Sequence, residues 1–167
     1  IELLHYSTVA ELYVFSRLTE DVWDRIFNAI DEVLNLLQKP APSSERFNSK
    51  SFDYVAHTQG RLKIFAEQSG VQLDQQIKYD GKKLGSLDQI AKRIATYVPS
   101  FTPKDLTIVH GDMCASNILY DYRTERIYMI DPRGLDFEGR ITHFGDKRYD
   151  VSKLLQSFSG KYDNIIS

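Results

Sequence analysis

The stretch that decides the fold is Val109-His110-Gly111-Asp112-Met113-Cys114-Ala115-Ser116-Asn117, followed further along the chain by Ile130-Asp131-Pro132-Arg133. The apolar segments 117–120 and 127–130 flank a polar turn and predict a β-hairpin. Because Asn117 begins the first strand and Asp131 follows the second, both side chains are expected at the same end of this hairpin. Asp112 lies on the loop that leads into that end. The sequence therefore predicts that two carboxylates and one carboxamide converge there.

The chemistry of these three groups suits a magnesium ion and a reacting hydroxyl. Mg²⁺ takes oxygen ligands from one or two protein groups and completes its shell with substrate phosphates and water. Asn117 and Asp131 are therefore expected to hold it, and Asp112 remains to orient a hydroxyl and accept its proton. The order His-x-Asp-x-x-x-x-Asn, followed by a strand that ends in Asp, is that of the kinase catalytic loop. It predicts phosphoryl transfer.

The same residues also have structural interpretations. Asp and Asn are common in turns and helix caps, which is the alternative for Asp112, Asn117 and Asp131. His110 is expected to pack as a hydrogen-bonded histidine and not to transfer protons. Cys114 has no paired histidine and is expected to be a small packing residue.

The rest of the chain is mainly helical. Apolar residues recur at helical spacing over 9–15, 19–37, 51–69, 86–97 and 149–158. The third of these helices is expected to turn Tyr54, Val55, Leu62, Phe65 and Ala66 inward and to end at Gly70. Segment 39–50 is predicted as a polar connection and 135–146 as irregular. Helices and strands are segregated, so the predicted class is α+β, mainly α.

Three local signals mark turns and helix starts. Thr8 with Glu11, and Ser86 with Gln89, fit capping boxes. Asp80-Gly81 predicts a tight turn between two short extended segments.

Composition narrows the class of protein. The chain has 167 residues, a formal charge of −2, 42% hydrophobic residues and one cysteine. No charged block favours nucleic acid or a membrane surface as a partner, and no apolar run reaches the ~18 residues that span a bilayer. A single cysteine fits a reducing compartment, so a cytoplasmic protein is expected.

The decisive stretch resembles a known superfamily. Val109-His110-Gly111-Asp112 through Asn117-Ile118-Leu119, with Ile130-Asp131, resembles the aminoglycoside phosphotransferase and choline kinase superfamily. Gly111, where protein kinases usually carry Arg, favours the small-molecule branch. Asp131-Pro132-Arg133-Gly134, Tyr149-Asp150 and Gly160-Lys161-Tyr162-Asp163 resemble kinase-like proteins encoded among bacterial capsule and surface-polysaccharide genes.

The resemblance implies the C-terminal, substrate-binding lobe of a protein-kinase-like fold over residues 6–167. The catalytic loop is then 107–120 and the metal-binding segment 127–134. The implied roles are Asp112 as catalytic base, Asn117 and Asp131 as magnesium ligands, and His110 and Asp150 as structural supports. Residues 1–5 resemble the remnant of a hinge, in which the backbone of Glu2, Leu3 and Leu4 meets the adenine of ATP.

The family's nucleotide-binding lobe is absent from this sequence. Neither GxGxxG nor GxxxxGK[ST] occurs, and no strand lysine can be placed before the hinge. Because that lysine helps to neutralise the phosphates, the chain alone is expected to bind ATP poorly and to be weakly active or inactive. Its expected partner is the N-terminal lobe of the same polypeptide.

The predicted function is transfer of the ATP γ-phosphoryl group, with Mg²⁺, to a hydroxyl of a small acceptor. A sugar, an amino alcohol or a surface-polysaccharide precursor would fit. The alternatives are a non-catalytic kinase-like binding module and a metal-dependent phosphohydrolase. Arg133 either contacts an anionic substrate or phosphate, or forms an ion pair with Asp136 or Glu138.

Overall fold

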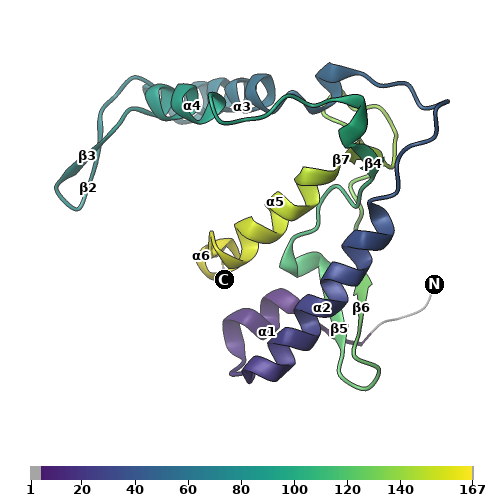
Figure 1. Cartoon of the computed structure of the whole chain (residues 1–167). Coiled ribbons are helices and arrows are strands. Elements are labelled where there is room, and N and C mark those ends of the chain that lie inside the picture. The colour runs from purple at the N-terminus through teal and green to yellow at the C-terminus, as the bar shows by residue number, and fades with distance from the viewer. Residues whose placement is uncertain (1–4, 167) are drawn as a thin grey trace. The chain divides into compact units, whose positions relative to one another are not determined.

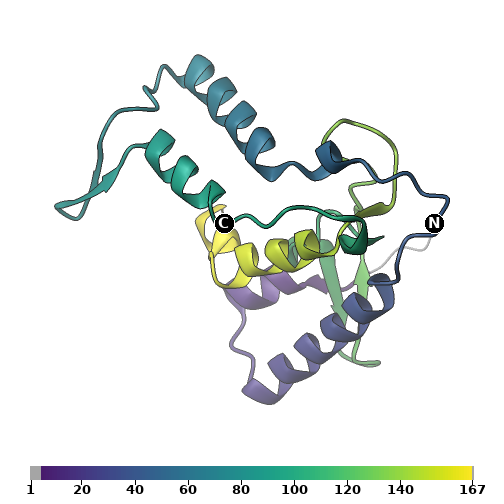
Figure 2. The same cartoon turned by 45° about the horizontal axis from the view of Figure 1, so that its top comes forward.

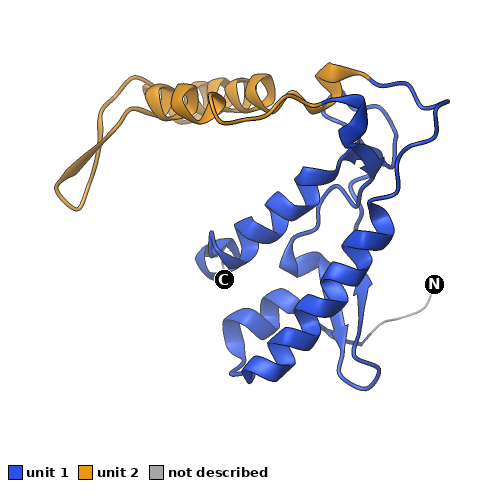
Figure 3. Ribbon diagram, in the orientation of Figure 1, with its two compact units in different colours: residues 1–47, 102–167 blue, residues 48–101 orange. Residues whose placement is uncertain are grey.

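The computed structural model describes residues 5–166, with only the backbone of Ile166. The predicted hinge residues Glu2, Leu3 and Leu4 lie outside the described residues. The chain divides into two compact units, blue and orange in Figure 3. Unit 1 comprises Ile1–Phe47 and Thr102–Ser167, and unit 2 is the intervening Asn48–Phe101.

Unit 1 contains most of the secondary structure (Figure 1). Its helices are α1 (Val9–Phe15), α2 (Glu20–Leu37), α5 (Lys147–Phe158) and α6 (Tyr162–Ile166), with 3₁₀ turns at Pro103–Asp105 and Ala115–Asn117. Its strands are β1 (Ser7–Thr8), β4 (Leu106–Ile108), β5 (Ile118–Asp121), β6 (Arg126–Met129) and β7 (Phe144–Asp146). The mixed, mostly helical α+β class is confirmed.

The first two helices begin and end close to where the sequence predicts. Thr8 and Glu11 form the predicted capping box, with Glu11 N donating to Thr8 Oγ1 at 3.1 Å and Thr8 N donating to Glu11 Oε2 at 2.8 Å. The long helix α2 starts one residue after its predicted start and buries Ile26, Ala29 and Ile30. Its apolar stripe therefore packs into the core, as the spacing predicts.

The core of unit 1 includes the loop that carries the candidate site. Its buried apolar residues are Val9, Ala10, Leu12, Ile26, Ile30, Met113, Ala115, Ile118, Tyr120 and Leu154. Met113 and Ala115 are fully buried, whereas the Asp112 side chain between His110 and Met113 is 40% exposed. Apolar burial thus fixes the loop on one side and leaves the carboxylate accessible.

The predicted hairpin is confirmed. β5 pairs antiparallel with β6, with Ile118 opposite Met129, and β1 adds to the other edge of β5. The prediction of irregular structure over 135–146 is wrong at its C-terminal end, because Phe144–Asp146 forms β7 and pairs with β4. Three residues that include a glycine show no strand periodicity, so pairing with a distant strand decides their conformation. The sequence prediction also lacks β1 and α6.

Unit 2 consists of a 3₁₀ turn (Ser49–Phe52), α3 (Tyr54–Ser69), the hairpin β2 (Ile77–Tyr79) and β3 (Lys82–Gly85), and α4 (Leu87–Ala95). Figure 2 shows α3 and α4 running in opposite directions. The Asp80-Gly81 turn, the Ser86 and Gln89 capping box and the left-handed Gly70 at the end of α3 are as predicted.

The predicted inward face of α3 is only partly correct. No residue of α3 is buried, and Phe65 is 46% exposed. Within unit 2, a second helix and a short hairpin do not cover the whole apolar stripe. Among residues 5–166, no helix is long and apolar enough to cross a membrane.

Candidate active site

The backbone of the loop 109–117 is held by a buried carboxylate. Asp150 on α5 is 2% exposed and accepts hydrogen bonds from His110 N at 2.8 Å and from Gly111 N at 2.9 Å. Burial raises the pKa of Asp150, and the two amide bonds offset part of that rise, so its pKa lies above the ordinary value. The brace that the family resemblance implies for Asp150 stays a prediction, and these contacts support it.

Three residues on one face of α5 make polar contacts with this loop. Asp150, Lys153 and Ser157 lie at helical spacing on that face. Lys153 Nζ is 2.9 Å from Asp112 Oδ1, and Ala115 N donates to the fully buried Ser157 Oγ at 3.0 Å. The sequence prediction includes neither Lys153 nor Ser157. Their spacing of three and seven residues from Asp150, on a predicted helix, places all three on one face and could have indicated them.

Lys153 is the charged neighbour of the candidate base. Its side chain is 23% exposed. Burial lowers the pKa of Lys153, but the hydrogen bond and the charge of Asp112 raise it further, so the pKa lies above its ordinary value. The ammonium group is therefore charged at neutral pH and holds one carboxylate oxygen of Asp112 in place.

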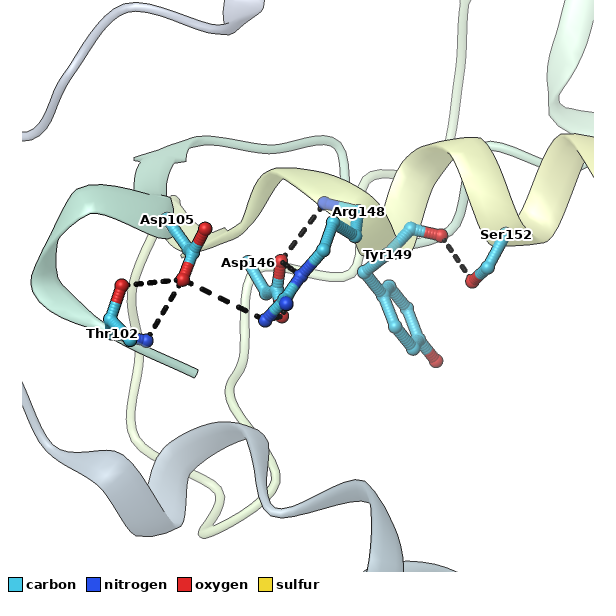
Figure 4. Close-up of polar contacts among 6 residues, drawn as sticks. All are labelled: Thr102, Asp105, Asp146, Arg148, Tyr149 and Ser152. Atoms are coloured by element: carbon cyan, nitrogen blue, oxygen red, sulfur yellow. Dashed lines mark hydrogen bonds and ion pairs between the residues drawn. The ribbon is translucent and has the colours of Figure 1, made fainter. Parts of the chain in front are cut away.

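The N-terminus of α5 is itself fixed to the segment before β4 (Figure 4). Asp146 caps the helix by accepting from Arg148 N at 2.9 Å. The Arg148 guanidinium donates through Nε to Asp146 at 2.8 Å, and its Nη2 lies 3.8 Å from Asp105 Oδ2. Because Asp146 is fully buried, this charged pair fixes where α5 begins, and so where Asp150 and Lys153 lie.

The hairpin brings Asn117 and Asp131 to the same end. Ile130 N donates to Asn117 O at 3.0 Å, and Asp131 follows with a left-handed backbone, φ +55°. Asn117 Nδ2 donates to the backbone carbonyl of Asp112 at 2.9 Å, which leaves Asn117 Oδ1 as the oxygen that can bind a ligand. The backbone thus brings the loop that carries Asp112 to the end of the hairpin where Asn117 and Asp131 lie, as the sequence predicts.

The donor set at this end fits a magnesium ion. Asn117 Oδ1 and the exposed Asp131 carboxylate are hard oxygen donors. In the described part of the chain, no group of three or more His, Cys, Asp or Glu residues fits a metal. Two protein ligands, with the remaining positions left to substrate oxygens and water, are what Mg²⁺ commonly takes. The metal-binding roles of Asn117 and Asp131 stay predictions.

His110 is buried, at 7% exposure, and neither ring nitrogen has a hydrogen-bond partner among the described residues. Its predicted hydrogen bond is therefore absent on the side chain, although its backbone carbonyl accepts from Arg133 N at 3.0 Å. The structural role implied for His110 stays a prediction, supported by this burial.

Gly111 allows the segment after β6 to approach the loop. Its φ is +79°, and a Cβ at this position would lie 2.9 Å from Arg133 Cβ. Only glycine accommodates both the left-handed backbone and this contact without a shift.

Comparison with solved structures identifies the fold. The chain matches the crystal structure of an aminoglycoside-3'-phosphotransferase of type VIII with a TM-score of 0.52 and 18% sequence identity. The match covers 97% of this chain and 53% of that one, so this chain spans about half of the solved structure's length. No protein-family model and no curated protein matches the sequence. The chain therefore has the kinase-like fold of an aminoglycoside phosphotransferase over about half of that protein, consistent with one lobe.

Proposed function

We propose that this chain is the C-terminal, substrate-binding lobe of a small-molecule phosphotransferase that moves the γ-phosphoryl group of ATP to an alcohol. The observation that carries the proposal is the arrangement of Asp112, Asn117 and Asp131. The last two lie at one end of a hairpin, and the Asn117 side chain is bonded to the backbone of Asp112. The kinase-like fold supports it.

In this mechanism Asp112 accepts a hydrogen bond from the acceptor hydroxyl and takes its proton as the oxygen attacks the γ-phosphorus. Lys153 orients the carboxylate, because its ammonium group holds Oδ1 at 2.9 Å. The other carboxylate oxygen, Oδ2, then faces the acceptor. Asp150 and Ser157 act through the backbone, by fixing the loop on which Asp112 lies.

Asn117 Oδ1 and the Asp131 carboxylate would hold Mg²⁺. When bound, the ion supplies positive charge to the phosphate oxygens during transfer. The remaining contacts to ATP are assigned to a nucleotide-binding lobe outside these 167 residues, with Glu2, Leu3 and Leu4 as the proposed hinge. The solved structure, about twice as long as the matched part, supports this assignment. The acceptor is a small hydroxyl compound such as a sugar, an amino alcohol or a surface-polysaccharide precursor.

The test is Asp112→Asn in the full-length polypeptide, with a panel of hydroxyl acceptors and MgATP. Loss of the proton acceptor is expected to lower turnover by about 10²–10⁴-fold. The melting temperature should stay near that of the wild type, because the exposed carboxylate bonds only Lys153 among described side chains. Asp24→Asn, an exposed position on α2, is the matched control.

Two results would contradict the proposal. Near-wild-type phosphorylation of the acceptor by Asp112→Asn would remove the residue from the mechanism. If the wild-type protein consumes ATP but forms no phosphorylated acceptor, it would instead be a phosphohydrolase.

A further inference from the structure

Arg133 lies against the loop that carries Asp112. Its backbone N donates to His110 O at 3.0 Å, and its Cβ would clash with any side chain at Gly111. Backbone and side-chain root are thus both fixed next to the candidate active site. A Cβ at Gly111 would also lie 3.6 Å from Arg133 Cδ, so the side chain of Arg133 runs beside this loop as far as Cδ.

The guanidinium has no acidic partner among residues 5–166. Of the two acids that the sequence offers, Asp136 is fully buried on its side chain and binds Arg140, with Nε to Oδ2 at 3.0 Å. No ion pair joins Arg133 to Asp136 or to Glu138 within the described chain. Of the two interpretations that the sequence leaves open for Arg133, the structural ion pair is wrong.

Aromatic rings hold the guanidinium instead. Its Cζ lies 5.0 Å from the centroid of the Phe137 ring and 5.9 Å from that of Tyr149, and Nη1 donates to Tyr149 Oη at 3.1 Å. The two rings meet edge to face, with centroids 5.7 Å apart. Aromatic faces attract and orient a cation but do not cancel its charge. The result is a half-buried, oriented and uncompensated positive charge.

Most of the donors of Arg133 are unused. A guanidinium carries five N–H donors in a planar fork, and the described residues accept only through Tyr149. Nε and Nη2 form the edge that binds carboxylates and phosphates in a bidentate manner. Lys153 differs from Arg133 in this respect, because its ammonium group is already paired with Asp112.

We propose that Arg133 binds an oxyanion, a carboxylate or a phosphate, of a ligand in the active site. This proposal rests on the proposed function, because that function supplies the two sources of the oxyanion. They are an acidic group on the acceptor and the terminal phosphate of ATP. If the source is the acceptor, the substrate class narrows to hydroxyl compounds that carry a negative charge, such as sugar acids or sugar phosphates. Phe137 and Tyr149 position the guanidinium.

The experiment follows the Arg133 Nε–Hε signal by NMR in the ¹⁵N-labelled full-length polypeptide during titration with inorganic phosphate. The backbone amide signals of Gly111 and Tyr149 are followed as well, because the Arg133 variants keep them. Saturable movement of that signal is expected. Arg133→Met should weaken phosphate binding about tenfold or more, the loss expected for a charge-assisted contact. Arg133→Lys keeps the positive charge but not the planar fork of donors, so its affinity for phosphate should lie between those of the wild type and Arg133→Met. Arg17→Met removes the same charge from an exposed position in unit 1 and should bind as the wild type does.

Four further ligands distinguish the two sources of the oxyanion. D-Glucuronate that competes with phosphate at Arg133, while D-glucose does not, assigns the oxyanion to the acceptor. Competition by MgATP but not MgADP assigns it to the terminal phosphate. Because the NMR titration measures binding without turnover, Asp112→Asn should still bind phosphate even where phosphorylation of the acceptor is lost. Failure of the proposed function and failure of this inference would therefore be seen in different measurements.

The inference is overturned if phosphate, glucuronate and MgATP all leave the wild-type Arg133 signal unmoved. It is also overturned if Arg17→Met weakens binding as much as Arg133→Met, since phosphate would then be responding to net charge alone.

Discussion

Unit 1 and unit 2 differ in what they bury. Unit 1 buries a continuous apolar core together with charged groups, and Asp146 and Asp150 are at most 2% exposed. In unit 2 neither α3 nor α4 has a buried residue. Buried polar groups need defined partners, so they fix geometry, whereas exposed helices tolerate change. The comparison suggests that unit 1 holds the chemistry, and we expect unit 2 to contribute to the choice of acceptor.

The largest expected effect on stability comes from the core. Ile118→Ala removes a fully buried side chain of unit 1 and should lower the free energy of unfolding by about 2–5 kcal/mol. Ile94→Ala on α4, where the side chain is 55% exposed, should change it by less than about 0.5 kcal/mol. Denaturant unfolding, followed by circular dichroism and by the fluorescence of Trp23 in unit 1, measures both. Equal effects would contradict the difference between the units.

Removal of the buried carboxylate is expected to rank next. Asp150→Ala leaves His110 N and Gly111 N without their acceptor and should cost about 2–4 kcal/mol. Asp53→Ala in unit 2 removes a helix cap, the bond from Ala56 N at 2.9 Å, and should cost about 1 kcal/mol. Amide exchange of residues 110 and 111 provides the local readout. Protection that survives in Asp150→Ala would exclude Asp150 as the brace.

Two left-handed glycines offer a smaller, paired comparison. Gly111→Ala meets both a φ of +79° and Arg133 Cβ at 2.9 Å, and should cost about 2–3 kcal/mol. Gly70→Ala in unit 2 has a φ of +73° but open space, so only the backbone cost of about 1 kcal/mol remains. Thermal unfolding of both variants measures the difference. A smaller loss for Gly111→Ala would mean that the Arg133 segment moves away freely.

The smallest expected effect depends on pH. The hydrogen bond from the Thr102 hydroxyl to Asp105, at 2.6 Å, lowers the pKa of this carboxyl. The folded state then binds its proton less tightly than the unfolded state, so the stabilisation is present above about pH 4 and is lost as the pH falls through the folded pKa. Asp105→Asn should cost about 1 kcal/mol at pH 7 and progressively less as the pH falls below about 4.

The control for this titration is Asp88→Asn in unit 2, which breaks an exposed ion pair with Lys92 at 2.7 Å and should cost less than about 0.5 kcal/mol at pH 7. A cost for Asp105→Asn that does not change with pH would mean that ionisation of Asp105 does not contribute. The pH dependence expected for Asp150 has the opposite sign to that of Asp105. Its raised pKa means that the stability it contributes falls as the pH rises above about 4.

Local signals predicted much of the fold. The two capping boxes, the Asp80-Gly81 turn and the hairpin that carries Asn117 all depend on residues close in sequence, and all are present. What the sequence did not reveal depends on distant partners. β7 is a strand only because it pairs with β4, and Lys153 belongs to the site only because α5 lies against the loop. Neither has a periodicity or a motif of its own.

The environment of Arg133 shows the same limit. Spacing along the chain suggested Asp136 or Glu138 as its partner, but Arg140 binds Asp136 and the rings of Phe137 and Tyr149 hold Arg133. Tyr149 lies sixteen residues further on, at the start of α5. The first two carboxylates after Arg133 in the sequence were therefore a poor guide to the charge balance of the site.

The bonds from His110 and Gly111 to Asp150 have a consequence for synthesis. They span 40 and 39 residues, so the loop that carries Asp112 is made well before its brace. Because a chain emerges from the ribosome N-terminal end first, α1, α2 and the hairpin can associate while these two amides still bond to water. The loop acquires its final conformation only when α5 has been made and has docked. A chain that stops before α5 would contain Asp112, Asn117 and Asp131 and still be an incomplete site.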